Sequence, residues 1–318
     1  MQNIPTFNDI QLAHQRIAAH IHRTPVLTST GINAITGADI FFKCENFQKV
    51  GAFKYRGATN AVLSLTENEA SKGVATHSSG NHAAALALAA KNRGIRSFVV
   101  MPRTAPKPKV EAVRHYGGKI TFCEPTLQSR EETLKGIVEQ TGAYVVHPYD
   151  NFRVISGQGT AVLELLEQSP ALDVVMAPVG GGGLLSGTAL AAKSVNPLIK
   201  VIGCEPALAD DAYRSFKSGN LMPSVSPKTI ADGLLTSLSE RTFTIIRDRV
   251  DDILTVSEES IVRAMFLVWQ RMKIIIEPSS AVPVAALLDN HGLFAGKRVG
   301  IILSGGNVDL FHLPFQEG

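Results

Sequence analysis

Lys54 is the residue whose setting most clearly suggests chemistry. It follows Phe53, where a strand-like run over 40–46 and a glycine-containing turn give way to a helix-like pattern. A solvated lysine has a pKa near ~10.4 and is a poor nucleophile, but a lysine in a dry pocket can lose its proton and condense with an aldehyde. An isolated Phe-Lys pair is more often a surface lysine at a helix start, so the interpretation depends on other segments.

The segment 76–82 lies between an expected strand and an expected helix. Its backbone N–H groups would be unpaired and would converge at the positive end of the helix dipole, which suits a carboxylate. Simple N-capping of the helix by Ser79 or Asn81 is the alternative interpretation.

Gly180 to Gly183 follow the apolar strand 173–179 and open another helix. Consecutive glycines cost backbone entropy, and in return they let main-chain amides approach an anion closely. Neither dinucleotide-binding nor Walker spacing is present, so a phosphomonoester is the favoured guest. A flexible loop without a ligand is the alternative.

Two more strand ends carry polar side chains. Ser304 ends the last apolar strand, and its hydroxyl could bond a heteroaromatic nitrogen without carrying charge. Residues 205–211 place several carboxylates in one loop, and oxygen ligands suit a hard cation such as Mg²⁺ or Ca²⁺. By spacing alone, a solvated acidic turn is the better interpretation of that loop.

These strand ends belong to an alternating pattern that predicts an α/β fold with two lobes, each a mostly parallel sheet covered by helices. The first helix is expected over 8–22. The first series of strands is expected at 73–76, 97–101, 119–122 and 144–146, with helices at 81–93, 106–116 and 127–141. The second series is expected at 173–179, 200–204 and 298–304, with helices at 184–194 and 209–218. Ligands of such sheets bind beyond the carboxyl ends of strands, where the polar segments lie.

The composition is that of an ordinary globular protein of 318 residues, 45% hydrophobic, with a formal net charge of +3. The charge is spread without a Lys/Arg block, so we expect a small ligand and neither a nucleic-acid nor a membrane partner. No apolar run approaches the ~20 residues of a membrane span, and no export signal is recognisable, so we expect a cytoplasmic protein. Cys44, Cys123 and Cys204 fit buried, reduced thiols.

A reactive lysine beside an aromatic residue, a phosphate loop and a neutral partner for a ring nitrogen together describe a pocket for pyridoxal 5′-phosphate. The sequence resembles the fold type II (tryptophan synthase β-like) pyridoxal-phosphate enzymes, and within them the serine/threonine dehydratase and serine racemase group. Closer similarity to bacterial 3-hydroxyaspartate dehydratases and serine racemases is seen in residues 43–48, 231–233 and 277–280. The resemblance covers about residues 4–310.

The resemblance implies a large cofactor-binding domain (1–72 and 149–318) and a small mobile substrate domain (73–148). Lys54 would bind the cofactor covalently and act as the base, and Ser79 would be a second acid/base group. The remaining cofactor ligands would be Phe53, Asn81, Gly180, Gly181, Gly182, Gly183, Leu184 and Ser304. The substrate carboxylate would meet Ser78, Ser79, Asn81 and His82, and a divalent cation (Mg²⁺, or Ca²⁺ or Mn²⁺) would be held by Glu205, the carbonyl of Ala209, and Asp211.

Two features depart from relatives in the group. Animal serine racemases carry a glutamine where this chain has Ala84, which argues against ATP activation. The chain also ends shortly after its last strand, so we do not expect the amino-acid-sensing domain of biosynthetic threonine dehydratases.

Substrate choice is expected to depend on cationic side chains in the cleft. The second carboxylate of 3-hydroxyaspartate would be costly to bury alone, and Arg130 and then Arg153 are the expected partners. The leading interpretation is an ammonia-lyase that acts on a hydroxy amino acid, with dimers usual for similar proteins. The alternatives are a serine or aspartate racemase with lyase side activity, and a non-catalytic sensor that closes on a small ligand.

Overall fold

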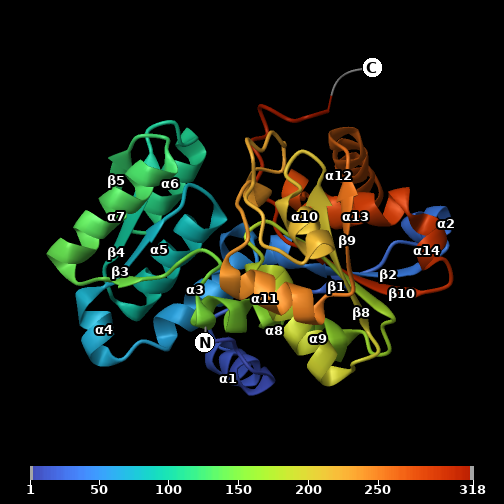
Figure 1. Cartoon of the computed structure of the whole chain (residues 1–318), viewed down its shortest axis with the longest axis horizontal. Coiled ribbons are helices and arrows are strands. Elements are labelled where there is room, and N and C mark those ends of the chain that lie inside the picture. Colours follow the sequence, from blue (N-terminus) through green and yellow to red (C-terminus); the bar gives the residue numbers. More distant parts are fainter. Residues whose placement is uncertain (1–2, 316–318) are drawn as a thin grey trace.

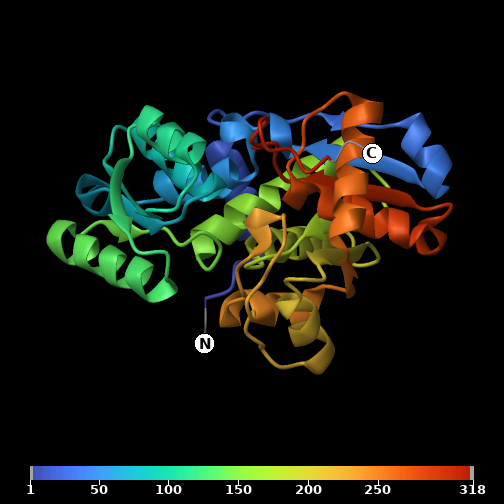
Figure 2. The ribbon, with the colours of Figure 1, turned by 90° about the horizontal axis from the view of Figure 1, so that it is seen from above.

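The computed structural model describes residues 3–315, which form two lobes, each built on its own sheet. Figure 1 shows the smaller lobe on the left and the larger on the right, and Figure 2 shows the same arrangement from above. In both sheets the paired strands run parallel, except that β1 pairs antiparallel with β2. The predicted α/β class is therefore confirmed.

The small sheet has the strand order β5-β4-β3-β6. Its elements are β3 (Val74–His77), α5 (Asn81–Arg93), β4 (Ser97–Pro102), α6 (Lys107–His115), β5 (Lys119–Cys123), α7 (Leu127–Thr141) and β6 (Tyr144–Val145). Alternate β4 residues face opposite sides: Phe98 and Val100 pack with α7, whereas Val99 and Met101 pack with α5 and α6. This is the two-sided burial expected of a parallel strand.

The large sheet has the order β1-β2-β10-β7-β8-β9. Its strands are β1 (Val26–Leu27), β2 (Asp39–Cys44), β7 (Val174–Pro178), β8 (Lys200–Pro206), β9 (Asp252–Val256) and β10 (Arg298–Leu303). One face packs on α2 (Thr30–Thr36), α12 (Glu258–Met272), α13 (Pro278–Asp289) and α14 (His291–Phe294). The other packs on α1 (Phe7–Ile17), α8 (Phe152–Gln168), α9 (Gly183–Val195), α10 (Asp211–Ser218) and α11 (Glu240–Arg249).

Helix α3 (Lys54–Leu63) joins the lobes, with α4 (Glu67–Lys72) after it. Its apolar side chains share a cluster with α5 and β3 of the small lobe, while its backbone crosses α8 of the large lobe. At that crossing a β-carbon on Gly157 would lie 2.6 Å from the Cα of Gly57, so only glycine permits the approach. The start of α3, where Lys54 lies, is therefore fixed against both lobes.

Two sequence expectations need correction. The first helix ends at Ile17, and the chain from residue 18 to 25 is turn, bend and irregular structure. The helices and strands that were not predicted at all are α2, α4, α8, α11, α12, α13, α14, β1 and β9. The domain boundaries and the mobility of the small lobe stay predictions, although all four strands of the small sheet lie within 73–148. Within residues 3–315, no helix has the length and apolar character that crossing a bilayer requires.

Candidate functional site

A cavity of about 300 Å³ opens between the lobes, beyond the carboxyl ends of β3, β7 and β10. Its lining includes Phe53, Lys54, Ser78, Ser79, Asn81, His82, Arg130, Gly180, Gly181, Gly182, Gly183, Leu184 and Ser304. These are the predicted catalytic, cofactor and substrate residues apart from Arg153. The structure thus brings together segments that lie far apart in the chain.

Lys54 is the first residue of α3, and its Nζ donates to the carbonyl of Pro148 at 2.9 Å. Burial lowers the pKa of this amine to about 8, although the nearby Glu277 carboxylate favours the charged form. At pH 7 roughly one Lys54 side chain in ten is then neutral, against about one in three thousand for an ordinary lysine. The amine also lies 5.1 Å from the centre of the Phe53 ring. The setting is that of a nucleophile.

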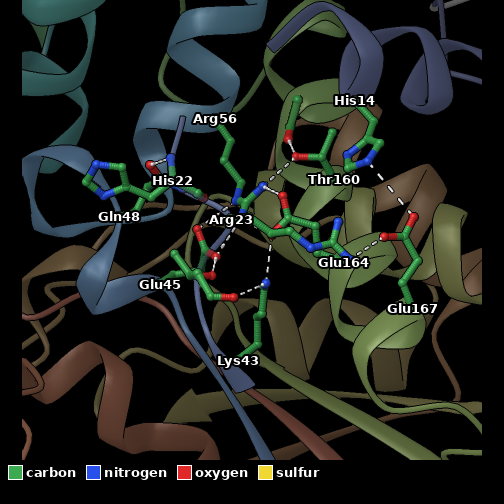
Figure 3. Close-up of polar contacts among 12 residues, drawn as sticks. His14, His22, Arg23, Lys43, Glu45, Gln48, Arg56, Thr160, Glu164 and Glu167 are labelled. Atoms are coloured by element: carbon green, nitrogen blue, oxygen red, sulfur yellow. Dashed lines mark hydrogen bonds and ion pairs between the residues drawn. The ribbon is translucent and has the colours of Figure 1, made fainter. Parts of the chain in front are cut away.

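A buried ionic network holds the first turn of α3, which has no side-chain cap of its own. Figure 3 shows Arg56 between Glu45 and Glu164, with Lys43 beneath them. Arg56 bonds both carboxylates in bidentate fashion and also reaches Thr160, so all five of its N–H groups can be used. Burial disfavours the Arg56 charge, but the two carboxylates outweigh burial and raise its pKa.

Lys43 completes the network. Its three N–H groups reach Glu164, Gln168 and the carbonyl of Thr24 at 2.7–2.8 Å. Two cations therefore face two carboxylates in a region where all four side chains are almost fully buried. Such a balanced set fixes geometry, because every donor has one place to point.

The glycine loop after β7 is shaped by packing. A β-carbon on Gly181 would lie 2.3 Å from the Tyr149 ring, and one on Gly180 would lie 2.9 Å from the Cα of Leu234. Gly182 has φ +83° and is the N-cap residue of α9, which has no side-chain cap. The open helix start and the absence of side chains fit a phosphate group. The glycines thus have a packing role in addition to the predicted one.

Helix α5 also starts without a side-chain cap, because Gly80 is its N-cap residue. The alternative of capping by Ser79 or Asn81 is therefore wrong. His82 is buried, and its Nε2 lies 3.0 Å from the carbonyl of Val146, which can only accept. Burial lowers the pKa of His82 to about 3, so the ring is neutral and its Nδ1 is an acceptor. Any carboxylate contact from His82 must come from its backbone N–H.

The two candidate arginines differ. Arg130 lies on α7 and lines the cavity. Each arginine has one buried nitrogen without a hydrogen-bond partner among the described residues, Nε of Arg130 and Nη1 of Arg153, so the cavity lining distinguishes them. Arg153 is outside the cavity lining: its guanidinium lies 3.3 Å from Glu69 and 4.8 Å from the centre of the Tyr144 ring. The expectation that Arg153 faces the cleft is wrong in this structure, because Glu69 and Tyr144 already hold its side chain.

The predicted cation ligands lie away from the cavity, at the end of β8 and the start of α10. Glu205 accepts the N–H groups of Ala212 and Tyr213, and Asp211 accepts that of Leu238 through Oδ2. The buried Oδ1 of Asp211 has no partner among the described residues. Burial raises the pKa of Glu205 to about 9 and that of Asp211 to about 6.

Two buried carboxylates and an unused oxygen fit a hard cation, which would replace the protons they otherwise hold. Within residues 3–315, no group of three or more His, Cys, Asp or Glu side chains is arranged to bind a metal. The predicted set contains only two such side chains and a carbonyl. The cation stays a prediction.

Glu277 was not predicted as a site residue, although it belongs to the segment that carried the family resemblance. It lines the cavity, is buried, and accepts the Asn81 amide at 2.9 and 3.1 Å. Burial and then Asp232 raise its pKa to about 7. The available signal was a carboxylate just before Pro278 at a helix start, a pattern that is usually structural.

A sequence model for the family described as pyridoxal-phosphate dependent enzyme matches residues 17–305. The chain belongs to this family. It is 56% identical over 313 residues to a β-hydroxyaspartate dehydratase of Paracoccus denitrificans, covering 98% of this chain and 99% of that protein. Its structure resembles the serine racemase of Dictyostelium discoideum at TM-score 0.93 and 53% identity, covering 96% and 99% of the chains. It also resembles the maize serine racemase at TM-score 0.95 and 48% identity, covering 97% and 95%.

The predicted family, fold type II pyridoxal-phosphate enzymes, is therefore confirmed, and so is the cofactor class. The residues of the cavity fit the cofactor, since they offer an amine of lowered pKa, an aromatic ring beside it and a side-chain-free helix start. The role of each individual residue stays a prediction.

Proposed function

We propose that this enzyme is an ammonia-lyase that eliminates water from a 3-hydroxy amino acid, with 3-hydroxyaspartate preferred over serine and threonine. Loss of water would give an enamine, which is released as the imine or hydrolysed by water to a 2-oxo acid and ammonia. The dehydratase named among the relatives supports the reaction class. The observation that carries the substrate assignment is Arg130, a cavity-lining guanidinium whose buried Nε has no partner among the described residues.

Charge in the cavity supports that substrate. Three cationic side chains line it, but Lys109 is paired with Asp232 and Lys54 is reserved for the cofactor. Arg130 is then left for a second substrate carboxylate, which it can bind in bidentate fashion. Serine has no such group, so the Arg130 cation would stay uncompensated with serine bound.

The cofactor supplies an electron sink that weakens the bond between the substrate Cα and its proton. Lys54, whose pKa is lowered to about 8, would bind the cofactor and later take that proton. The amides of Gly180 to Gly183 would hold the phosphate, and Ser304 and Phe53 would contact the ring. Backbone N–H groups of residues 78–82 would hold the α-carboxylate.

The test compares Arg130→Ala with Arg153→Ala, which removes the same charge outside the cavity. We expect Arg130→Ala to lower kcat/KM for 3-hydroxyaspartate roughly 10- to 100-fold, the cost of a lost charged hydrogen bond, and to change that for L-serine far less. Arg153→Ala should leave the ratio unchanged. The four stereoisomers of 3-hydroxyaspartate, L-serine and L-threonine should be assayed with and without Mg²⁺. An unchanged preference in Arg130→Ala would overturn the substrate assignment.

A racemase is the second candidate, because Ser79 lines the same cavity as Lys54 and serine racemases are close relatives. Racemisation needs one group to remove the proton and another to return it from the opposite face. Accumulation of D-serine from L-serine, lost in Ser79→Ala while 2-oxo acid release continues, would support it. The sensor alternative has no support from the family assignment.

We further propose a divalent cation at Glu205, the Ala209 carbonyl and Asp211, a mobile small domain over 73–148, a homodimer and a cytoplasmic location. The cation proposal is supported by the partnerless Asp211 oxygen. Metal analysis of the purified protein and light scattering would test the cation and the dimer.

A further inference from the structure

Three polar side chains from separate elements meet at one wall of the cavity: Asn81 at the start of α5, Glu277 at the start of α13, and Asn307 after β10. Asn81 belongs to the small lobe, and the other two belong to the large lobe. Asn307 also bonds the carbonyl of Val50, in the turn that leads to Lys54. The contacts therefore join both lobes and the segment that carries the lysine.

The hydrogen bonds of this group have only one consistent direction. A backbone carbonyl can only accept, so the amide nitrogen of Asn307 must face Val50, at 2.8 Å. The same nitrogen lies 2.9 Å from the next side chain, which must therefore present its oxygen, Oδ1 of Asn81. The nitrogen of Asn81 then faces Glu277. The Val50 carbonyl thus sets the orientation of the Asn307 amide, and Asn307 sets that of the Asn81 amide.

Glu277 is the last member of this series of hydrogen bonds, because its carboxylate accepts N–H groups from both asparagines. Asn81 Nδ2 lies 2.9 and 3.1 Å from the two oxygens, and the backbone N–H of Asn307 lies 3.2 Å from one of them. The two oxygens of one carboxylate are close together, so a single N–H of Asn81 can point between them. The second N–H of Asn81 is then free for the cavity that Asn81 lines.

We propose that Glu277 is a positioning residue, which together with Asn307 fixes the Asn81 amide so that one N–H points at an acceptor oxygen of the bound cofactor. We call Asn81, Glu277 and Asn307 the interlobe clamp. This proposal rests on the proposed contact between Asn81 and the cofactor. It adds that the contact depends on an acceptor on the opposite lobe, so cofactor binding and the seating of α5 on the large lobe are coupled.

The clamp is also sensitive to pH. Burial and Asp232 raise the pKa of Glu277 to about 7, while Asn81, Lys109 and the Asn307 backbone act in the opposite direction, and the Lys54 amine also lies nearby. A proton on Glu277 turns one acceptor into a donor that faces N–H groups. Cofactor affinity should therefore fall as pH falls through about 7, in addition to the fall that protonation of Lys54 causes near pH 8.

The experiment measures pyridoxal phosphate dissociation constants by equilibrium dialysis, and the visible absorption spectrum of the bound cofactor, from pH 6 to 9. Glu277→Gln keeps the shape and removes the charge, Asn307→Leu removes the amide, and Asn307→Asp replaces the donor with an acceptor that repels the Val50 carbonyl and Asn81 Oδ1. Glu258→Gln is the matched control, since Glu258 accepts a backbone N–H in the same lobe and does not line the cavity. Circular dichroism checks folding.

We expect Glu277→Gln and Asn307→Leu to bind the cofactor roughly 10-fold more weakly, as for one lost charge-assisted hydrogen bond, and Asn307→Asp to bind more weakly still. The component of the pH dependence due to Glu277 should disappear in Glu277→Gln, and the component due to Lys54 should move to lower pH, because the Glu277 carboxylate favours the charged lysine. In Asn307→Leu, which keeps the Glu277 carboxylate, both components should remain. The control should match the wild type.

Wild-type affinity and wild-type pH dependence in Glu277→Gln would overturn the proposal. If Glu277→Gln did not fold, wild-type affinity in both Asn307 variants would overturn it equally, because both break the clamp from its other end. Failure of the wild-type protein to bind pyridoxal phosphate would instead overturn the proposed function. The two failures are therefore distinguishable.

Discussion

Two groups of buried charged side chains in this chain differ in how fully their charges are compensated by partners. In the network around Arg56, two cations meet two carboxylates and every cationic N–H has an acceptor. For the charged groups of the cavity and for Glu205, the cost of burying a charge exceeds the stabilisation that nearby partners give to the charged form. There the pKa values of Lys54, Glu277 and Glu205 move to about 8, 7 and 9.

The difference separates structural from functional roles. In the Arg56 network the partners raise the pKa of Arg56 and lower that of Glu164, which favours the charged forms, whereas burial still lowers the pKa of Lys43. The network fixes the geometry around it because every donor has an acceptor. A buried charge with too few partners is costly, and it is ready to exchange a proton, bind a cation or react. The first group holds the start of α3 in place, and the second includes Lys54, the residue at that start for which we propose a catalytic role.

The largest expected effect comes from breaking the compensated group. Arg56→Met leaves Glu45 and Glu164 buried together with only Lys43, so the free energy of unfolding should fall by about 3–5 kcal/mol. Arg23→Met removes the same charge from an exposed pair with Glu167 and should cost less than about 1 kcal/mol. Urea denaturation measures both. Equal, small effects would show that the Arg56 network is not a source of stability.

The pH dependence of stability tests the second group at Glu205. Its folded pKa is about 9 against an ordinary 4.5, so between these values the folded protein keeps a proton that the unfolded chain releases. Stability without a cation should therefore fall as pH rises from 5 to 9, by at most about 1.4 kcal/mol per pH unit.

A cation would replace that proton, so the increase in melting temperature given by Mg²⁺ should grow with pH. Glu205→Gln should remove both the slope and the Mg²⁺ effect. Melting curves of chelated and Mg²⁺-saturated protein at several pH values provide the measurement. A stability that does not change from pH 5 to 8 in chelated protein would contradict a costly buried carboxylate at this position.

Replacing Lys54 by methionine should change the free energy of unfolding in the opposite direction from replacing Arg56. Lys54→Met removes a poorly compensated charge and keeps the aliphatic volume, so the unfolding free energy without cofactor should rise by about 0.5–2 kcal/mol while covalent cofactor binding is lost. Urea denaturation of the cofactor-free variant measures this change. A loss of stability comparable to that of Arg56→Met would mean that both lysine and arginine belong to one structural network.

The sequence predicted the small lobe and the strand-end residues well, because these depend on local signals. Strand and helix bounds over 73–146 agree with the structure within about two residues at each end, since two-sided strands alternate there with helices that end at or just before Gly94, Gly117 and Gly142. The glycine run, the 76–82 segment and Ser304 could be placed at one sheet edge because the carboxyl ends of parallel strands meet there.

What could not be predicted depends on contacts far apart in the chain. Helix α8 has polar residues at helical spacing, Ser156, Thr160 and Glu164, but it is buried from Val154 to Leu165 because Thr160 and Glu164 contact Arg56 of another helix. Glu277 and Arg56 are ordinary charged residues in sequence, and only their burial against Asn81, Glu45 and Glu164 gives them a role. In the sequence, Arg153 and Arg130 were both candidates for a residue that faces the cleft. The structure distinguishes them because Arg153 is paired with Glu69.

The central claim is that Lys54 is the amine that binds the cofactor, because its site favours the neutral form. The direct test is borohydride reduction of the protein with pyridoxal phosphate over a range of pH, followed by peptide mass spectrometry. We predict modification at Lys54 with a midpoint near pH 8. Modification spread over surface lysines, or a midpoint at Lys54 near the ordinary 10.5, would contradict the account.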